Sequence, residues 1–133
     1  MTDITNIKPE ARKIEILHPG TGEEIGVTVE ILSVGDPTLK NIKRRITDER
    51  IKLESKGKSY KSEDIEDNMD KITIGAIVGW DWHGDITLKG EKNPEATPKN
   101  IKHIFEEAPW FRAQVIEAIN DESAFFKTSK QDS

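Results

Sequence analysis

The sequence predicts a mostly helical α+β fold, in which an N-terminal β-hairpin packs against about four helices. Two segments in which apolar and polar residues alternate, separated by turn residues, indicate the hairpin. Apolar residues at spacings of three, four and seven, preceded by residues typical of helix starts, indicate the helices. We expect one domain over residues 1–128, followed by a flexible tail at 129–133.

The predicted hairpin covers about residues 12–34. Ile14 and Ile16 lie on one side of its first strand, and β-branched residues alternate between 25 and 31 in its second. The intervening turn is predicted at Pro19-Gly20-Thr21-Gly22. A two-stranded hairpin is marginally stable alone, so its apolar face must cover helices or its edge must pair with another chain.

Four helices are predicted, over residues 37–55, 63–79, 98–108 and 109–120. Asp36-Pro37 and Thr97-Pro98 each combine an N-cap with a proline at the first helical position. The helical spacing predicts which residues form the buried apolar faces: Leu39, Ile42, Ile46 and Leu53 on the first helix, and Ile65, Met69, Ile72 and Ala76 on the second. Residues 81–96 are predicted to be a loop, and the chain is predicted to fray after Asn120.

Composition excludes several classes of protein. The net charge of −5 argues against nonspecific binding to nucleic acid. No apolar run approaches the ~20 residues needed to span a bilayer, and the N-terminus lacks the pattern of a signal peptide. The absence of cysteine excludes disulfides, thiolate metal sites and cysteine nucleophiles. We therefore expect a cytoplasmic protein that does not bind membranes.

No residue pattern indicates catalysis, a cofactor or a metal. Asp81, His83 and Asp85 alternate and could face one side of an extended segment, but no fourth ligand is identifiable. A loop histidine beside aspartates is more often a surface hydrogen-bonding group. The glycines within residues 20–26 lack the spacing of a phosphate loop, and neither a carboxylate pair nor a nucleophile elbow is present. We predict a non-enzymatic protein without cofactors.

Charge is segregated along the chain. Residues 40–61 carry nine lysines or arginines against three acids, and residues 62–96 carry nine acids against three lysines. Two helices that neutralise each other when packed antiparallel explain this pattern. The alternative is a basic helix that binds nucleic acid, with Lys40, Lys43, Arg44 and Arg45 towards phosphates. No recognition motif or stacking aromatic accompanies these residues, so nucleic-acid binding is the weaker interpretation.

The aromatic residues are the candidates for partner binding. The three tryptophans lie at breaks between predicted elements, where large aromatics either lock helices together or contact a partner. Core packing is the simpler interpretation for Trp80 and Trp110. The candidate partner-binding residues are Trp82 in the loop, Trp110, Phe111 and Val115 on a helix with two apolar faces, and Phe125 and Phe126 at the fraying end.

A succession of motifs covers residues 65–128. It consists of Val78-Gly79-Trp80, a loop containing glycine and proline, the helix start Thr97-Pro98, and a helix carrying Trp110, Arg112, Gln114 and Val115. This succession resembles the tail assembly chaperones of long-tailed bacteriophages and prophages. The N-terminal hairpin and the basic helix lie outside the resemblance.

The resemblance implies a non-enzymatic chaperone that coats the tape measure protein and helps to recruit tail tube subunits. Such a chaperone works in the cytoplasm of the host bacterium and is not expected in the mature virion. Self-association stays open, as does pairing of hairpins between chains. The alternatives are a structural component of the tail or virion, and a small nucleic-acid-binding regulator.

Overall fold

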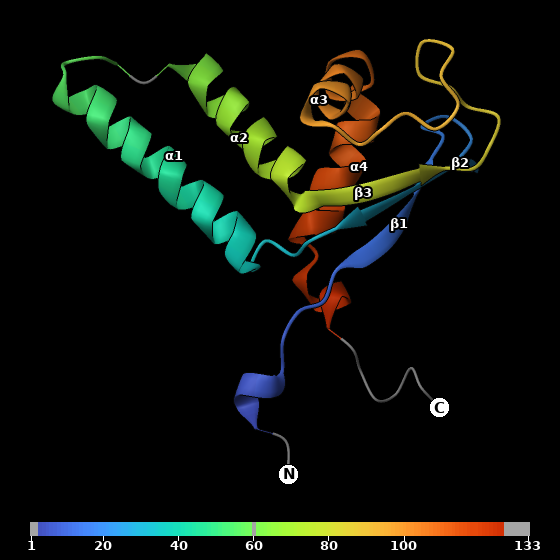
Figure 1. Ribbon diagram of the computed structural model, residues 1–133, viewed down its shortest axis with the longest axis horizontal. Coiled ribbons are helices and arrows are strands. Elements are labelled where there is room, and N and C mark those ends of the chain that lie inside the picture. The colour runs from blue at the N-terminus through green and yellow to red at the C-terminus, as the bar shows by residue number, and fades with distance from the viewer. Residues whose placement is uncertain (1–2, 60, 127–133) are drawn as a thin grey trace.

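The computed structural model describes residues 3–59 and 61–126 of the chain (Figure 1). The elements in chain order are η1 (Ile4–Asn6), β1 (Arg12–Leu17), β2 (Glu24–Ile31), α1 (Pro37–Ser55), α2 (Ser62–Ala76), β3 (Ile77–Trp82), α3 (Pro98–Glu107), α4 (Pro109–Asn120) and η2 (Glu122–Phe125). An antiparallel sheet and four α-helices confirm the predicted α+β, mostly helical class. The predicted tail at 129–133 lies outside the described residues.

β1 and β2 form the predicted hairpin, with Ile14 opposite Val29. His18 holds its turn: the ring Nδ1 accepts hydrogen bonds from the N–H of Gly20 at 3.0 Å and from that of Thr21 at 3.2 Å. The turn also requires a φ of 75° at Gly22, a value that side chains disfavour. The turn residues therefore act as the sequence predicted, and the exposed ring of His18 stabilises the turn.

The second predicted helix, over 63–79, is wrong at its end. α2 stops at Ala76, and the chain continues directly into β3, which pairs antiparallel with β2 in the sheet order β1-β2-β3. The predicted loop over 81–96 is therefore also wrong at its start, where Trp82 completes the strand. The run before Trp80 is apolar all round, and such a run fits a buried strand as well as a buried helix. Pairing with the open edge of β2 decides between them.

The core lies between one face of the sheet and the helices, and Figure 1 shows α4 crossing the strands. The sheet contributes alternating residues to it, as its period-2 pattern predicts. The fully buried strand residues are Ile16, Val27, Val29 and Ile31, and the helices add Leu39, Ala76, Ile101, Ile104, Phe105, Phe111, Val115 and Ile119. One apolar cluster thus joins the sheet to all four helices.

α1 and α2 form a helical hairpin that extends to one side of the sheet (Figure 1). Leu39 is fully buried at its base, and a methyl group added to Gly75 would overlap Ile42 Cδ1, so the two helices approach closely there. Farther out the hairpin is open to solvent. The predicted burial of Ile65 and Met69 is wrong, because no described element covers that face of α2.

The starts of α1 and α3 follow the predicted caps. The Asp36 carboxylate accepts a hydrogen bond from the N–H of Thr38 at 2.9 Å, and the Thr97 hydroxyl accepts one from the N–H of Asn100 at 3.2 Å. Each side chain satisfies a backbone donor of the first helical turn, which otherwise lacks a partner. Local sequence therefore determines where these helices begin.

Candidate functional site

The candidate site is an apolar groove between α2 and α4. Ile65, Met69 and Ile72 follow at spacings of four and three, so they share one face of α2. Ile65 is 51% exposed and Met69 is 46% exposed. The groove has a volume of about 140 Å³ and is lined by Val34, Lys43, Met69, Ile72, Thr73, Ile116, Ile119 and Asn120. An uncovered apolar stripe along a helix is typical of a surface that binds another helix.

An ion pair fixes the two walls of the groove. Arg112 Nε on α4 donates a hydrogen bond to Asp70 Oδ1 on α2 at 2.6 Å. The two side chains are 28% and 24% exposed, so solvent screens their attraction less than it would at an open surface. Sequence reasoning did not identify Asp70, because nothing in the local pattern indicates a partner 42 residues away. Arg112 was identified only as one of the residues that carry the family resemblance.

Gln114 joins α4 to the edge of the sheet. Its Oε1 accepts from the Leu17 N–H, and its Nε2 donates to the Leu17 carbonyl, both at 2.8 Å. This side chain therefore satisfies the outward backbone groups of β1 at Leu17, where another strand could otherwise add. β2 is paired on both sides, so β3 fills the β2 edge of the hairpin, and β1 and β3 are the outer strands of the sheet.

The structure distributes the six predicted partner-binding residues between core and surface. Four are buried: Trp82 (9% exposed), Phe111 (3%), Val115 (0%) and Phe125 (2%). Trp110 and Phe126 are half-buried. In this fold the buried four contribute to core packing, and an open contact surface at these residues is contradicted by their burial. A partner-binding role for Trp110 and Phe126 stays a prediction.

Three of the six residues meet at one place, here called the apical pocket. This small hollow of about 160 Å³ lies where the loop after β3 meets the corner between α3 and α4. Its lining includes Ile25, Val27, Trp82, Ile86, Leu88, Ile104, Glu107, Ala108, Trp110 and Phe111. Tertiary folding thus brings Trp82 to the consecutive residues Trp110 and Phe111, which lie far from it in the sequence, around a single apolar space.

Trp80 supports this corner from the side of the core. Its ring lies 5.5 Å from that of Trp82 and 6.5 Å from that of Phe111, measured between centroids. Its Nε1 donates a hydrogen bond to the Pro94 carbonyl at 2.6 Å, which holds the loop against β3. The interpretation of Trp80 as a packing residue agrees with these contacts.

The sequence predicted that the chain frays after Asn120, but the residues directly after α4 are held in place. η2 turns Phe125 inwards, and the Arg12 guanidinium lies 5.6 Å from the centre of its ring. Arg12 Nη1 also lies 3.8 Å from Asp121 Oδ2, and the Phe125 carbonyl accepts from the Glu10 N–H at 2.8 Å. These contacts anchor residues 121–126 to the start of β1.

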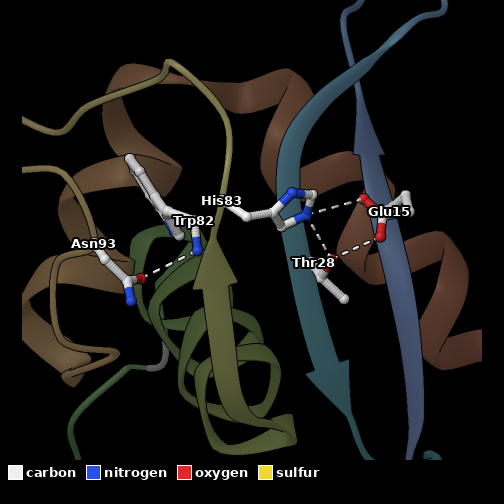
Figure 2. A network of polar contacts seen from close by, with 5 residues as sticks. All are labelled: Glu15, Thr28, Trp82, His83 and Asn93. Carbon is white, nitrogen blue, oxygen red and sulfur yellow. Dashed lines mark hydrogen bonds and ion pairs between the residues drawn. The ribbon is translucent and has the colours of Figure 1, made fainter.

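A polar network occupies the outer face of the sheet (Figure 2). The Thr28 hydroxyl donates to Glu15 Oε1 at 2.6 Å, and its oxygen lies 3.1 Å from His83 Nε2. With the hydroxyl hydrogen directed to Glu15, the Thr28 oxygen accepts a hydrogen bond from His83 in the ring tautomer that carries a proton on Nε2. Glu15 approaches that same nitrogen at 3.8 Å, whereas a catalytic triad places its carboxylate on the other ring nitrogen. The network joins β1, β2 and the end of β3.

The structure gives no metal site among residues 3–59 and 61–126, where no cluster of three or more potential ligands occurs. His83 is engaged with Thr28 and Glu15, while Asp81 and Asp85 are exposed. No helix in the described part of the chain is both long and apolar enough to cross a membrane.

Comparisons with protein-family models, curated proteins and solved structures found no match for this chain. No relative therefore assigns a role to the groove, to the apical pocket or to the residues that line them. Their contacts, charges and exposure are the basis on which a function is proposed.

Proposed function

We propose that this chain is a bacteriophage or prophage tail assembly chaperone, which binds the tape measure protein and helps to recruit tail tube subunits. One observation carries the proposal: the apolar stripe on α2 beside the α2–α4 groove, in which Ile65 and Met69 are exposed and Ile72 is half-buried. The resemblance over residues 65–128 supplies the class of partner. The proposed place of action is the cytoplasm of the host bacterium, with release before the virion is complete.

The groove suits one face of an amphipathic helix. Apolar side chains of a partner helix, three or four residues apart, would lie against Met69 and Ile116, where they would remove the exposed apolar surface of both molecules from water. Lys43 lies at the rim and favours an acidic residue beside the partner's apolar face. Many such weak contacts along one long partner would give strong overall binding through a high effective concentration.

The motif residues of α4 serve the groove indirectly. Arg112 sets the position of α4 against α2 through Asp70, and Gln114 sets it against β1 through Leu17. Both side chains are therefore assigned to positioning the groove walls, and neither is required to touch the partner. This assignment explains why an arginine and a glutamine accompany the apolar residues of the motif.

The decisive experiment is co-expression of this chain with the tape measure protein encoded beside it, followed by affinity capture and light scattering. The expected result is soluble tape measure protein in a complex that holds several copies of the chain. Met69→Lys and Ile65→Lys should reduce capture, because each places a charge in the apolar contact. Ile51→Lys is the matched control, since Ile51 is a similarly exposed helical residue (59%) that does not line the groove.

The proposal would be excluded if the tape measure protein stayed insoluble on co-expression and this chain were recovered without it. Equal capture by wild type, Met69→Lys and Ile51→Lys would retain the chaperone function but exclude this groove. Presence of the chain in purified virions would favour the alternative of a structural tail component.

A second candidate function, nucleic-acid binding, is favoured by the exposure of α1. Lys40, Lys43, Arg44 and Arg45 are all exposed, and no ion pair joins the described residues of α1 to those of α2. The predicted neutralisation of the basic helix α1 by the acidic helix α2 therefore involves no direct ion pair between their described residues. Submicromolar DNA binding that weakens steeply with salt, and that Arg44→Glu abolishes, would support this function.

A further inference from the structure

The helical hairpin of α1 and α2 buries apolar side chains at its base but not towards its tip. Leu39 is fully buried at the base, and Figure 1 shows the two helices diverging from there towards the segment that connects them. On α1, Ile46 and Leu53 are only half-buried. On α2, Met69 is 46% exposed and Ile65 is 51% exposed. The described part of the chain therefore leaves the apolar faces of both helices incompletely covered.

The apolar residues of the two helices follow the repeat that is typical of helix bundles. They are separated by three, four or seven residues: Leu39, Ile42, Ile46 and Leu53 on α1, and Ile65, Met69, Ile72 and Ala76 on α2. This repeat places them on one seam of each helix, which Glu49 interrupts on α1. Two diverging helices leave such seams open, whereas a four-helix bundle encloses them.

The two helices carry opposite charges. α1 has six lysines or arginines against three acids, and α2 has five acids against one lysine. The positions that flank the seam of α1 are all basic and exposed: Lys43, Arg45, Arg50 and Lys52. Of these, Arg50 pairs with Glu54 in its own helix. No ion pair joins the described residues of α1 to those of α2 within a chain, so the complementary charges are not matched directly in one copy.

We infer that two copies of this chain associate through their helical hairpins as a four-helix bundle, with α1 of each copy beside α2 of the other. Charge selects this arrangement, because α1 against α1 would oppose basic residues, whereas α1 against α2 opposes residues of different sign. A two-fold axis forms the same contact twice, so one sequence supplies both halves. Burial of the apolar seams supplies the affinity, since each exposed ion pair is weak.

The bundle uses the face of α2 that the proposed function assigns to the tape measure protein. Ile65 and Met69 cannot be covered by a second copy and by a partner helix at once, so the two contacts exclude each other. The association itself requires only this chain and does not rest on the proposed function. It is measured without the tape measure protein, so its failure is distinct from a failure of capture.

The test is analytical ultracentrifugation of the full chain from micromolar to millimolar concentration, where a dimer that weakens with added salt is expected. Two triple variants reverse the charge of one helix each. The first makes α2 basic (Glu63→Lys, Glu66→Lys and Asp67→Lys), and the second makes α1 acidic (Lys43→Glu, Arg45→Glu and Lys52→Glu). Each variant alone should dimerise about tenfold more weakly or worse, because it opposes like charges across the contact.

A mixture of the two triple variants should restore association, because each helix of one variant then meets a helix of opposite charge in the other. Circular dichroism verifies that both variants are folded. The mixture also separates contacts between copies from contacts within a copy, since mixing cannot repair a repulsion between α1 and α2 of the same chain.

Ile65→Asp tests the apolar seam and should weaken the dimer about tenfold or more, because it places a charge in the apolar contact. Ile51→Asp is the matched control, since Ile51 is similarly exposed (59% against 51%). Ile51 lies nine residues from Ile42, about two and a half turns, and therefore on the opposite side of α1. A chain that stays monomeric at millimolar concentration would overturn the inference. So would a dimer that Ile65→Asp leaves intact, or triple variants whose mixture associates no better than either alone.

Discussion

Arg112 Nε lies 2.6 Å from Asp70 Oδ1, and this contact is a polar link between α4 and α2, the two helices that form the groove. The two residues are far apart in the sequence but adjacent in the fold. The geometry of the groove therefore depends on a pair that contributes nothing to the apolar surface itself. Its removal should change stability and partner binding together.

Asp70→Asn should destabilise the fold by about 1–3 kcal/mol, because it leaves the Arg112 guanidinium partly buried without its charged partner. Urea unfolding monitored by tryptophan fluorescence measures the change. Glu54→Gln is the control, since Glu54 pairs with Arg50 at an exposed site on α1, and its loss should cost no more than ~0.5 kcal/mol. Equal losses for the two variants would contradict a structural role for the Arg112–Asp70 pair.

Gln114→Ala should expose the edge of the sheet at Leu17. It removes two hydrogen bonds to the backbone of β1, with an expected cost of roughly 1–3 kcal/mol and faster hydrogen exchange of the Leu17 amide. Glu117→Ala, at an exposed position one turn farther along α4, provides the comparison and should leave that amide protected. Unchanged exchange at Leu17 in Gln114→Ala would show that water replaces the side chain without loss.

Gly26→Ala should be among the more damaging substitutions in the sheet. Gly26 has a φ of 86°, and an added methyl group would overlap the backbone of Gly84, whose N–H donates to the Gly26 carbonyl at 3.1 Å. The strained φ and the overlap together should cost roughly 2–5 kcal/mol. Gly22→Ala separates the two effects, because its φ of 75° is similar but its surroundings are open, so about 1–2 kcal/mol is expected. Equal melting temperatures for the two variants would exclude the backbone contact as a cause.

Phe111→Ala should unfold or strongly destabilise the protein, by about 3–5 kcal/mol, because it empties a buried site between Trp80 and Phe105. Phe126→Ala, at a half-buried position, should cost much less. Thermal unfolding distinguishes them. A folded Phe111→Ala variant that failed only in partner capture would restore the original interpretation of Phe111 as a contact residue.

The sequence by itself determined the hairpin and the starts of two helices. Alternation around Ile14 and Val29, with glycines in the turn, is a local pattern whose periodicity fixes which side chains are buried. Asp36 and Thr97 act on backbone groups two or three residues away, so their effect requires no distant contact. The class of the fold follows from these short-range signals.

Only the tertiary structure decided the third strand, the open face of α2 and the grouping of the aromatic residues. A short apolar run fits a helix or a strand, and the free edge of β2 selected the strand at Ile77–Trp82. The spacing of Ile65 and Met69 fixes which face of α2 is apolar, but only the packing of other elements decides whether that face is covered. The contacts of Arg112 with Asp70, and of Gln114 with Leu17, join segments that are far apart in the sequence. No local pattern predicts these contacts, because folding alone brings the segments together.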